Sequence, residues 1–164
     1  MKVLVFTEGT IFTHEDWIGL AREKIVERVR AGQVPAYAGT TPIGGAVEKI
    51  RAWQRQGANI VYMTSRRADA VAEVRNVLER YDFPKGQLFF RREDEEYADV
   101  AERIMPDVLI EDDCESIGGE IQMTYPHIKP GLKERIKSIV VKEFGGIDYL
   151  PNDLLELANW CGAL

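Results

Sequence analysis

The chain has 164 residues, of which 45% are hydrophobic and 29% are charged, and this balance fits one globular domain over residues 1–164 with a sizeable core. Its formal net charge of -6 argues against a nucleic-acid partner, because phosphate backbones require a basic face. The first apolar run, Val3 to Phe6, is too short for a secretory signal, and no later stretch is long enough to span a bilayer. Cys114 and Cys161 lack the spacing of a zinc site or a disulfide framework, so we expect a reducing, cytoplasmic setting.

The first half of the sequence alternates between strand-like and helix-like patterns. Lys2 to Phe6 is apolar on both faces, which is typical of a strand in the middle of a parallel sheet. Helical spacing of apolar residues, with acidic residues near the start, predicts a helix from His14 to Ala31. Prolines and glycines indicate an irregular loop from Gln33 to Gly45. A helix from Ala46 to Gly57 and a buried strand from Asn59 to Met63 are expected next.

The second half continues this alternation. The expected elements are a helix over Ala68–Arg80, a strand over Leu88–Phe90, a helix over Tyr97–Met105, a strand over Asp107–Ile110, a loop-like region over Cys114–Pro130, a helix over Lys133–Lys137, a strand over Ser138–Phe144 and a helix over Pro151–Trp160. The pattern predicts an α/β fold with a mostly parallel sheet and helices on both faces. Ligands of such sheets collect at the carboxyl ends of the strands.

Hydroxyl and carboxylate groups follow three of the predicted strands, as Glu8-Gly9-Thr10, Thr64-Ser65-Arg66 and Glu111-Asp112-Asp113. In order and relative spacing the series resembles the haloacid dehalogenase superfamily, whose phosphatases use Asp-x-Asp-Gly-Thr, a Thr or Ser, a Lys and a terminal acidic pair. The resemblance covers most of the chain. It implies a Rossmann-like fold in which a small helical insertion, residues 14–45, serves as a reduced cap.

The acidic pair is the most specific part of this resemblance. Adjacent carboxylates that end a buried strand repel each other unless a cation or hydrogen-bond donors offset their charge. Mg²⁺ prefers such hard oxygen ligands. The resemblance implies that Asp112 binds Mg²⁺, with Asp113 beside it and Glu8 as a further ligand. The alternative is an exposed acidic turn that caps the next segment.

The second group supplies hydrogen-bond donors. The resemblance implies that Thr64 binds a phosphoryl oxygen and that Ser65 and Arg66 donate at the same rim, with Gly9 and Thr10 completing the substrate site. A charge-assisted bond from Arg66 would be the strongest of these. Alternatively, Thr64 and Ser65 only cap the helix that follows.

The first group departs from the family pattern. Aligned without a gap, the nucleophilic position falls on Phe6, which can neither attack phosphorus nor bind a metal, and the acid/base position falls on Glu8. With one residue deleted, Thr7 becomes the nucleophile and Glu8 its adjacent base. Successive side chains of an extended segment point to opposite faces, which argues against this pairing.

The family's lysine is also replaced, because its position falls on Tyr97. Lys85, Arg91, Arg92 or Lys129 would have to reach inward to restore the charge. Without that charge, phosphate binding weakens.

Two functions follow from these residues. The first is a divergent, Mg²⁺-dependent phosphohydrolase that acts on a small phosphorylated metabolite, with a metal-activated water as the attacking group. Because Ile110-Glu111-Asp112-Asp113 resembles nucleotidase-type members, a nucleotide is one such substrate. The second is a catalytically inactive descendant that binds a metabolite, a cation or a protein, as Phe6 and Tyr97 at two catalytic positions suggest.

Overall fold

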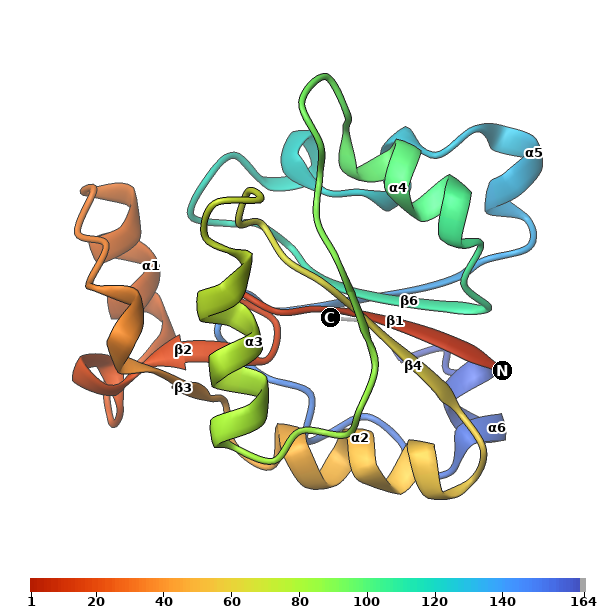
Figure 1. Ribbon diagram of the computed structural model, residues 1–164, viewed down its shortest axis with the longest axis horizontal. Helices are drawn as coiled ribbons and strands as arrows, with labels where there is room; N and C mark the ends of the chain where they lie inside the picture. The colour runs from red at the N-terminus through yellow and green to blue at the C-terminus, as the bar shows by residue number, and fades with distance from the viewer. Residues whose placement is uncertain (163–164) are drawn as a thin grey trace.

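The computed structural model describes residues 1–162 and contains one five-stranded parallel sheet (Figure 1). Residues 163 and 164, the end of the expected domain, lie outside this description. The strands are β1 (Lys2–Phe6), β4 (Asn59–Met63), β5 (Gln87–Phe89), β6 (Val108–Asp112) and β7 (Lys137–Val141). Their spatial order is β5-β4-β1-β6-β7, so β1 lies in the middle, and every pairing is parallel. The predicted fold class is confirmed.

Helices cover both faces of the sheet (Figure 1). On one face lie α2 (Ala46–Arg55), α3 (Val71–Arg80) and α6 (Leu154–Ala158), and on the other lie α4 (Tyr97–Ile104) and α5 (Pro130–Lys133). None of the helices in the part of the chain that the structure describes combines the length and apolar character needed to cross a bilayer.

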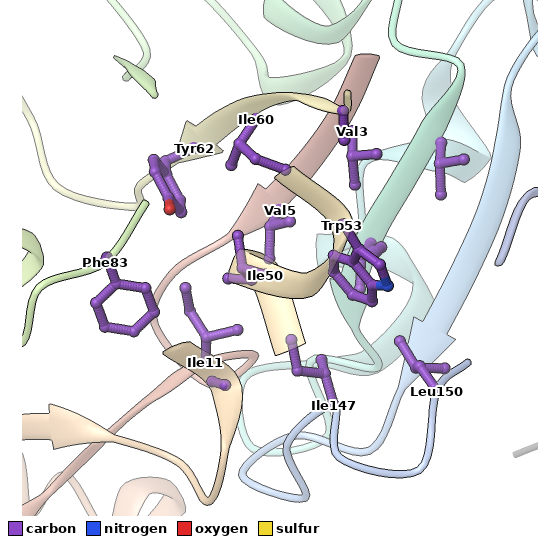
Figure 2. Close-up of a cluster of buried hydrophobic side chains, with 14 of the residues drawn as sticks. Val3, Val5, Ile11, Ile50, Trp53, Ile60, Tyr62, Phe83, Ile147 and Leu150 are labelled. Atoms are coloured by element: carbon purple, nitrogen blue, oxygen red, sulfur yellow. The ribbon is translucent and has the colours of Figure 1, made fainter. Parts of the chain in front are cut away.

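Two apolar clusters lie against the two faces of the sheet. Val3 and Val5 of β1 belong to the cluster under α2, where Trp53 is fully buried (Figure 2). Leu4 belongs to the opposite cluster, beneath α4. Because alternate side chains of a strand point to opposite faces, burial on both sides explains the continuous apolar runs of the central strands.

The prediction of one helix from His14 to Ala31 is wrong. The segment starts as a strand, β2 (Phe12–His14), continues as a 3-10 turn over Glu15–Trp17, and only then forms α1 (Arg22–Arg30). Gly19 between the two helical pieces has φ +82°, which a right-handed helix does not accommodate. The expected loop over residues 33–45 also contains a 3-10 turn, Tyr37–Gly39, and a strand, β3 (Thr40–Pro42), that pairs with β2 in antiparallel fashion.

Two predicted boundaries near the carboxyl end are also corrected. The helix expected over residues 133–137 is instead α5, which begins at Pro130, because a proline fits the first turn of a helix. The strand expected over residues 138–144 is β7, which starts at Lys137 and ends at Val141, where its pairing with β6 stops. Two short 3-10 turns, Gly119–Gln122 and Tyr125–His127, lie in the expected loop over residues 114–130.

Candidate functional site

A cavity of about 510 Å³ lies at the carboxyl edge of the sheet. Its walls combine the exits of the strands with side chains of the segment over residues 14–45, which lies beyond that edge in Figure 1. The polar and charged residues of the wall include Glu8, His14, Tyr37, Ser65, Arg66, Arg91, Glu111, Asp112 and Glu143. Some of the predicted phosphate donors and some of the predicted metal ligands therefore line the same cavity.

A tight turn carries the chain out of β1. The backbone N–H groups of Ile11 and Phe12 donate to the carbonyl of Thr7 at 3.0 and 2.9 Å. Gly9 has φ +77°, and a Cβ there would lie 2.9 Å from Oδ2 of Asp112, so this position combines a left-handed backbone with a close approach. The hydroxyl of Thr10 is fully buried and donates to the same carboxylate oxygen at 2.8 Å. The turn thereby joins β1 to the end of β6.

Glu8 accepts hydrogen bonds from several directions. Oε1 receives the hydroxyls of Tyr37 at 2.9 Å and Thr64 at 2.8 Å. Oε2 receives the hydroxyl of Thr7 at 2.8 Å and both the backbone N–H and the hydroxyl of Ser65, at 2.9 and 3.2 Å. The contact between Thr7 and Glu8 that strand geometry argued against forms because the chain leaves the strand at this point.

Three carboxylates gather where β6 and β7 end. Asp112, Asp113 and Glu143 each offer an oxygen, and these oxygens all lie within 4.8 Å of one another. Glu8 does not belong to this group. Carboxylate oxygens are the donors that Mg²⁺ prefers, and a carboxylate that already accepts one or two hydrogen bonds keeps lone pairs for a cation. The donor set therefore fits the metal that the fold family implies.

Charge and burial make this cluster costly without a cation. Burial raises the pKa of the Asp112 carboxyl to about 7, and the negative charge of Glu143 acts in the same direction. The hydroxyl of Thr10 and the N–H of Cys114 partly offset the effect by donating to Asp112. Burial likewise raises the pKa of Glu143, although Ser116 donates to it twice.

Two aromatic rings occupy the positions at which the family resemblance implies a nucleophile and a lysine. Phe6 and Tyr97 both line the cavity and meet edge to face, with ring centroids 5.4 Å apart. The guanidinium of Arg91 lies over the Tyr97 ring at 4.0 Å, and that of Arg66 lies over the Tyr37 ring at 4.3 Å. Positive charge thus reaches the cavity wall through two arginines rather than through a lysine.

The other residues considered for that charge lie elsewhere. Lys85 and Arg92 are exposed, and Lys129 pairs with Glu102 at 2.7 Å. Only Arg91 of the four candidates is among the cavity-lining residues.

The predicted site residues fall into two layers. Glu8, Gly9, Ser65, Arg66 and Asp112 line the cavity. A second set lies behind this wall, fully buried, and comprises Thr7, Thr10 and Thr64. Asp113 is not among the residues that line this cavity, and its carboxylate receives the N–H of Glu143 at 3.0 Å.

Sequence reasoning missed Glu143 and Tyr37 as site residues. Glu143 lies two residues beyond the end of β7, but the longer predicted strand concealed it. Tyr37 lies in the segment expected to be an irregular loop, where no local pattern marks a residue that reaches a distant carboxylate.

Glu111, the first acidic residue of its group, has a structural role. Its carboxylate is almost fully buried and accepts the backbone N–H groups of Thr124 at 2.6 Å and Tyr125 at 2.9 Å. It therefore anchors the loop that follows β6.

The segment over residues 14–45 is fastened to its surroundings. Arg80 of α3 donates to the carbonyls of Ala38 at 3.1 Å and Thr40 at 2.8 Å. From α1, Arg22 pairs with Glu115 at 2.8 Å, and Arg30 donates to the carbonyl of Glu115 at 2.9 Å. These contacts hold the segment over the strand exits.

Comparison with known proteins identifies the fold. Two structures of the Class C acid phosphatase from Bacillus anthracis, one with tungstate bound, match with TM-scores of 0.58 and 0.57 at 12% identity. Each match covers 88% of this chain, and 67% or 68% of the phosphatase. A family IA HAD hydrolase from Entamoeba histolytica matches at 12% identity with a TM-score of 0.45, over 94% of this chain and 88% of its own.

Sequence comparisons reach less far. The family described as PITM 1-3, LNS2 domain, matches residues 32–109, which is less than half of the chain. No curated protein matches significantly. The matches to the acid phosphatase nevertheless agree with the parallel sheet, and they show that this chain has the haloacid dehalogenase-like fold.

Proposed function

We propose that the protein binds a small phosphorylated molecule together with Mg²⁺ in this cavity and has lost the phospho-aspartyl chemistry of its fold. The contact between Phe6 and Tyr97 carries this proposal, because apolar and phenolic rings stand where a nucleophilic carboxylate and a cationic lysine are expected. Loss of both groups removes the covalent step and much of the charge stabilisation of its transition state.

The remaining groups suit binding. Asp112, Asp113 and Glu143 would hold Mg²⁺. When bound, that ion would neutralise charge on the phosphoryl group and on the cluster. Arg66 and Arg91, which also line the cavity, would attract the anionic group. The tungstate in one acid phosphatase structure supports an oxyanion site in this fold.

The ligand and its surroundings can be proposed more finely. A nucleotide fits a wall that also carries aromatic side chains, among them Trp17 and Phe144, which could pack against a base. We propose that the segment over residues 14–45 acts as the cap that covers this part of the ligand. Both cysteines are free thiols, which supports a cytoplasmic location.

Calorimetric titration tests this function. Mononucleotides and sugar phosphates should bind with Mg²⁺ present and more weakly with a chelator, and Asp112→Asn should remove the difference. Asp69→Asn, an exposed aspartate substitution, is the matched control. Ligand heats that are absent in every condition would refute the proposal.

A phosphohydrolase acting on a small phosphorylated metabolite is the second candidate. It is favoured by the presence of Glu8 and Asp112 on one cavity wall, because Glu8 could take a proton from a water that attacks phosphorus directly. The buried hydroxyl of Thr7 would then orient Glu8 rather than attack.

Turnover separates the two candidates. A panel of phosphomonoesters with Mg²⁺ should give equal background rates for the native chain and Asp112→Asn if the protein only binds. A rate that Asp112→Asn abolishes and Asp69→Asn preserves would establish the hydrolase instead.

A further inference from the structure

We infer that the donors around Glu8 form an oxyanion-binding site that the chain's own carboxylate fills, so that Glu8 competes with the phosphoryl group of a ligand. The inference rests on the proposed function only for the identity of the external competitor. The site itself follows from the hydrogen bonds around one side chain.

The donors converge from three separate parts of the chain. Thr7 comes from the exit of β1, Tyr37 from the capping segment, and Thr64 and Ser65 from the exit of β4. Their hydroxyls and one backbone N–H all lie between 2.8 and 3.2 Å from the Glu8 carboxylate oxygens. Convergence of this kind is how proteins hold a carboxylate or a phosphoryl group, since both accept several donors at once.

The site favours a bound anion even apart from Glu8. Thr64 is fully buried, and burial raises the pKa of Tyr37, with the charge of Glu8 adding to the effect, so its phenol remains a donor. Arg66, whose guanidinium lies over the Tyr37 ring at 4.3 Å, brings positive charge to the same rim. If the carboxylate were removed, these donors would lose their acceptor, and buried donors without acceptors are costly.

Glu8 therefore has a different role from that of a metal ligand or a base. Because the Glu8 carboxylate belongs to the same chain as its donors, its effective concentration at the site is high, and it excludes free anions from the site. A phosphoryl group reaching Thr64 and Ser65 must replace the carboxylate. Removing Glu8 should strengthen phosphate binding even without Mg²⁺, whereas removing a metal ligand should weaken it when Mg²⁺ is bound.

The experiment measures binding of inorganic phosphate in a chelating buffer. Glu8→Ala should bind phosphate at least about tenfold more tightly than the native chain, because one charge-assisted hydrogen bond regained is worth about that factor. Glu134→Ala, which removes an exposed glutamate, should match the native chain. Adding Thr64→Val to Glu8→Ala should reverse the gain.

A second variant guards against misfolding. Glu8→Gln keeps the size of the side chain but removes its charge, and it should also bind phosphate more tightly than the native chain. If folded Glu8→Ala and Glu8→Gln, checked by circular dichroism, bind phosphate no better than the native chain, the inference is wrong. This experiment uses neither Mg²⁺ nor an organic ligand. That result would therefore not contradict the proposed function, which the calorimetric titration tests separately.

Discussion

Replacing Asp112 by Asn should stabilise the metal-free protein at neutral pH. Burial, with a contribution from the charge of Glu143, raises the pKa of Asp112 from 3.8 to about 7. Each tenfold change in a proton equilibrium is worth about 1.4 kcal/mol, so the ionised carboxylate costs the folded state up to about 4 kcal/mol. Asn keeps an acceptor for one of the two donors, and losing the other costs about 1 kcal/mol. The net gain should be about 1–3 kcal/mol.

The sign of the effect depends on pH. Below about pH 4 the carboxyl is protonated in both folded and unfolded chains, so Asp112 carries no charge penalty. Between pH 4 and 7 the native chain loses stability as pH rises, because only the unfolded chain ionises freely. Asp112→Asn should therefore be neutral or slightly destabilising at pH 4 and should reach its full gain above pH 7.

Urea unfolding in a chelating buffer between pH 4 and pH 8 measures this gain, with Asp69→Asn as the control. When free Mg²⁺ replaces the chelator, it should stabilise the native chain but not Asp112→Asn, by about 1.4 kcal/mol at a free concentration ten times the dissociation constant. A variant less stable than the native chain at pH 8 would contradict the reasoning, because hydrogen bonding to Asp112 would then outweigh its desolvation.

Two further substitutions test the local geometry. Gly9→Ala should lower the free energy of unfolding by about 2–4 kcal/mol, since it adds a 2.9 Å clash to positive-φ strain. Gly57→Ala, with φ +92° and open space around its Cβ, should show only the strain of about 1–2 kcal/mol, and equal losses in urea unfolding would exclude the clash. Glu111→Ala should speed limited proteolysis within residues 114–130 by about tenfold, because two backbone donors lose their acceptor. Glu120→Ala, in the same loop, should cleave at the native rate, and unchanged cleavage of Glu111→Ala would show that the anchor is dispensable.

The central sheet could be predicted because its strands are buried on both faces and are therefore short apolar runs. The polar groups that follow these runs could be placed at one edge of the sheet, because parallel strands end at the same edge. The predicted ends of strands were wrong where pairing with a strand distant in the sequence determines them. β7 ends at Val141, where its pairing with β6 stops, whereas the predicted strand continued to Phe144 and so hid Glu143.

The segment over residues 14–45 was predicted less well than the sheet. Apolar spacing suggested one helix from His14, yet His14 pairs in a strand and its ring accepts the N–H of Asp16 at the start of a 3-10 turn. The hydrogen bond from Tyr37 to Glu8 joins residues 29 positions apart. Local patterns do not encode such contacts, which depend on how the whole chain folds.

The anchoring of the segment over residues 14–45 by Arg22, Arg30 and Arg80 has a thermodynamic consequence. Because this segment is already ordered, it would lose little conformational entropy when a ligand binds in the cavity. Ligand association should then show no slow phase from a conformational change. Selectivity among metabolites should depend on how well their shape fits the preformed cavity. Replacing one of these arginines should let the cavity accept a wider range of compounds and should lower its affinity for each of them.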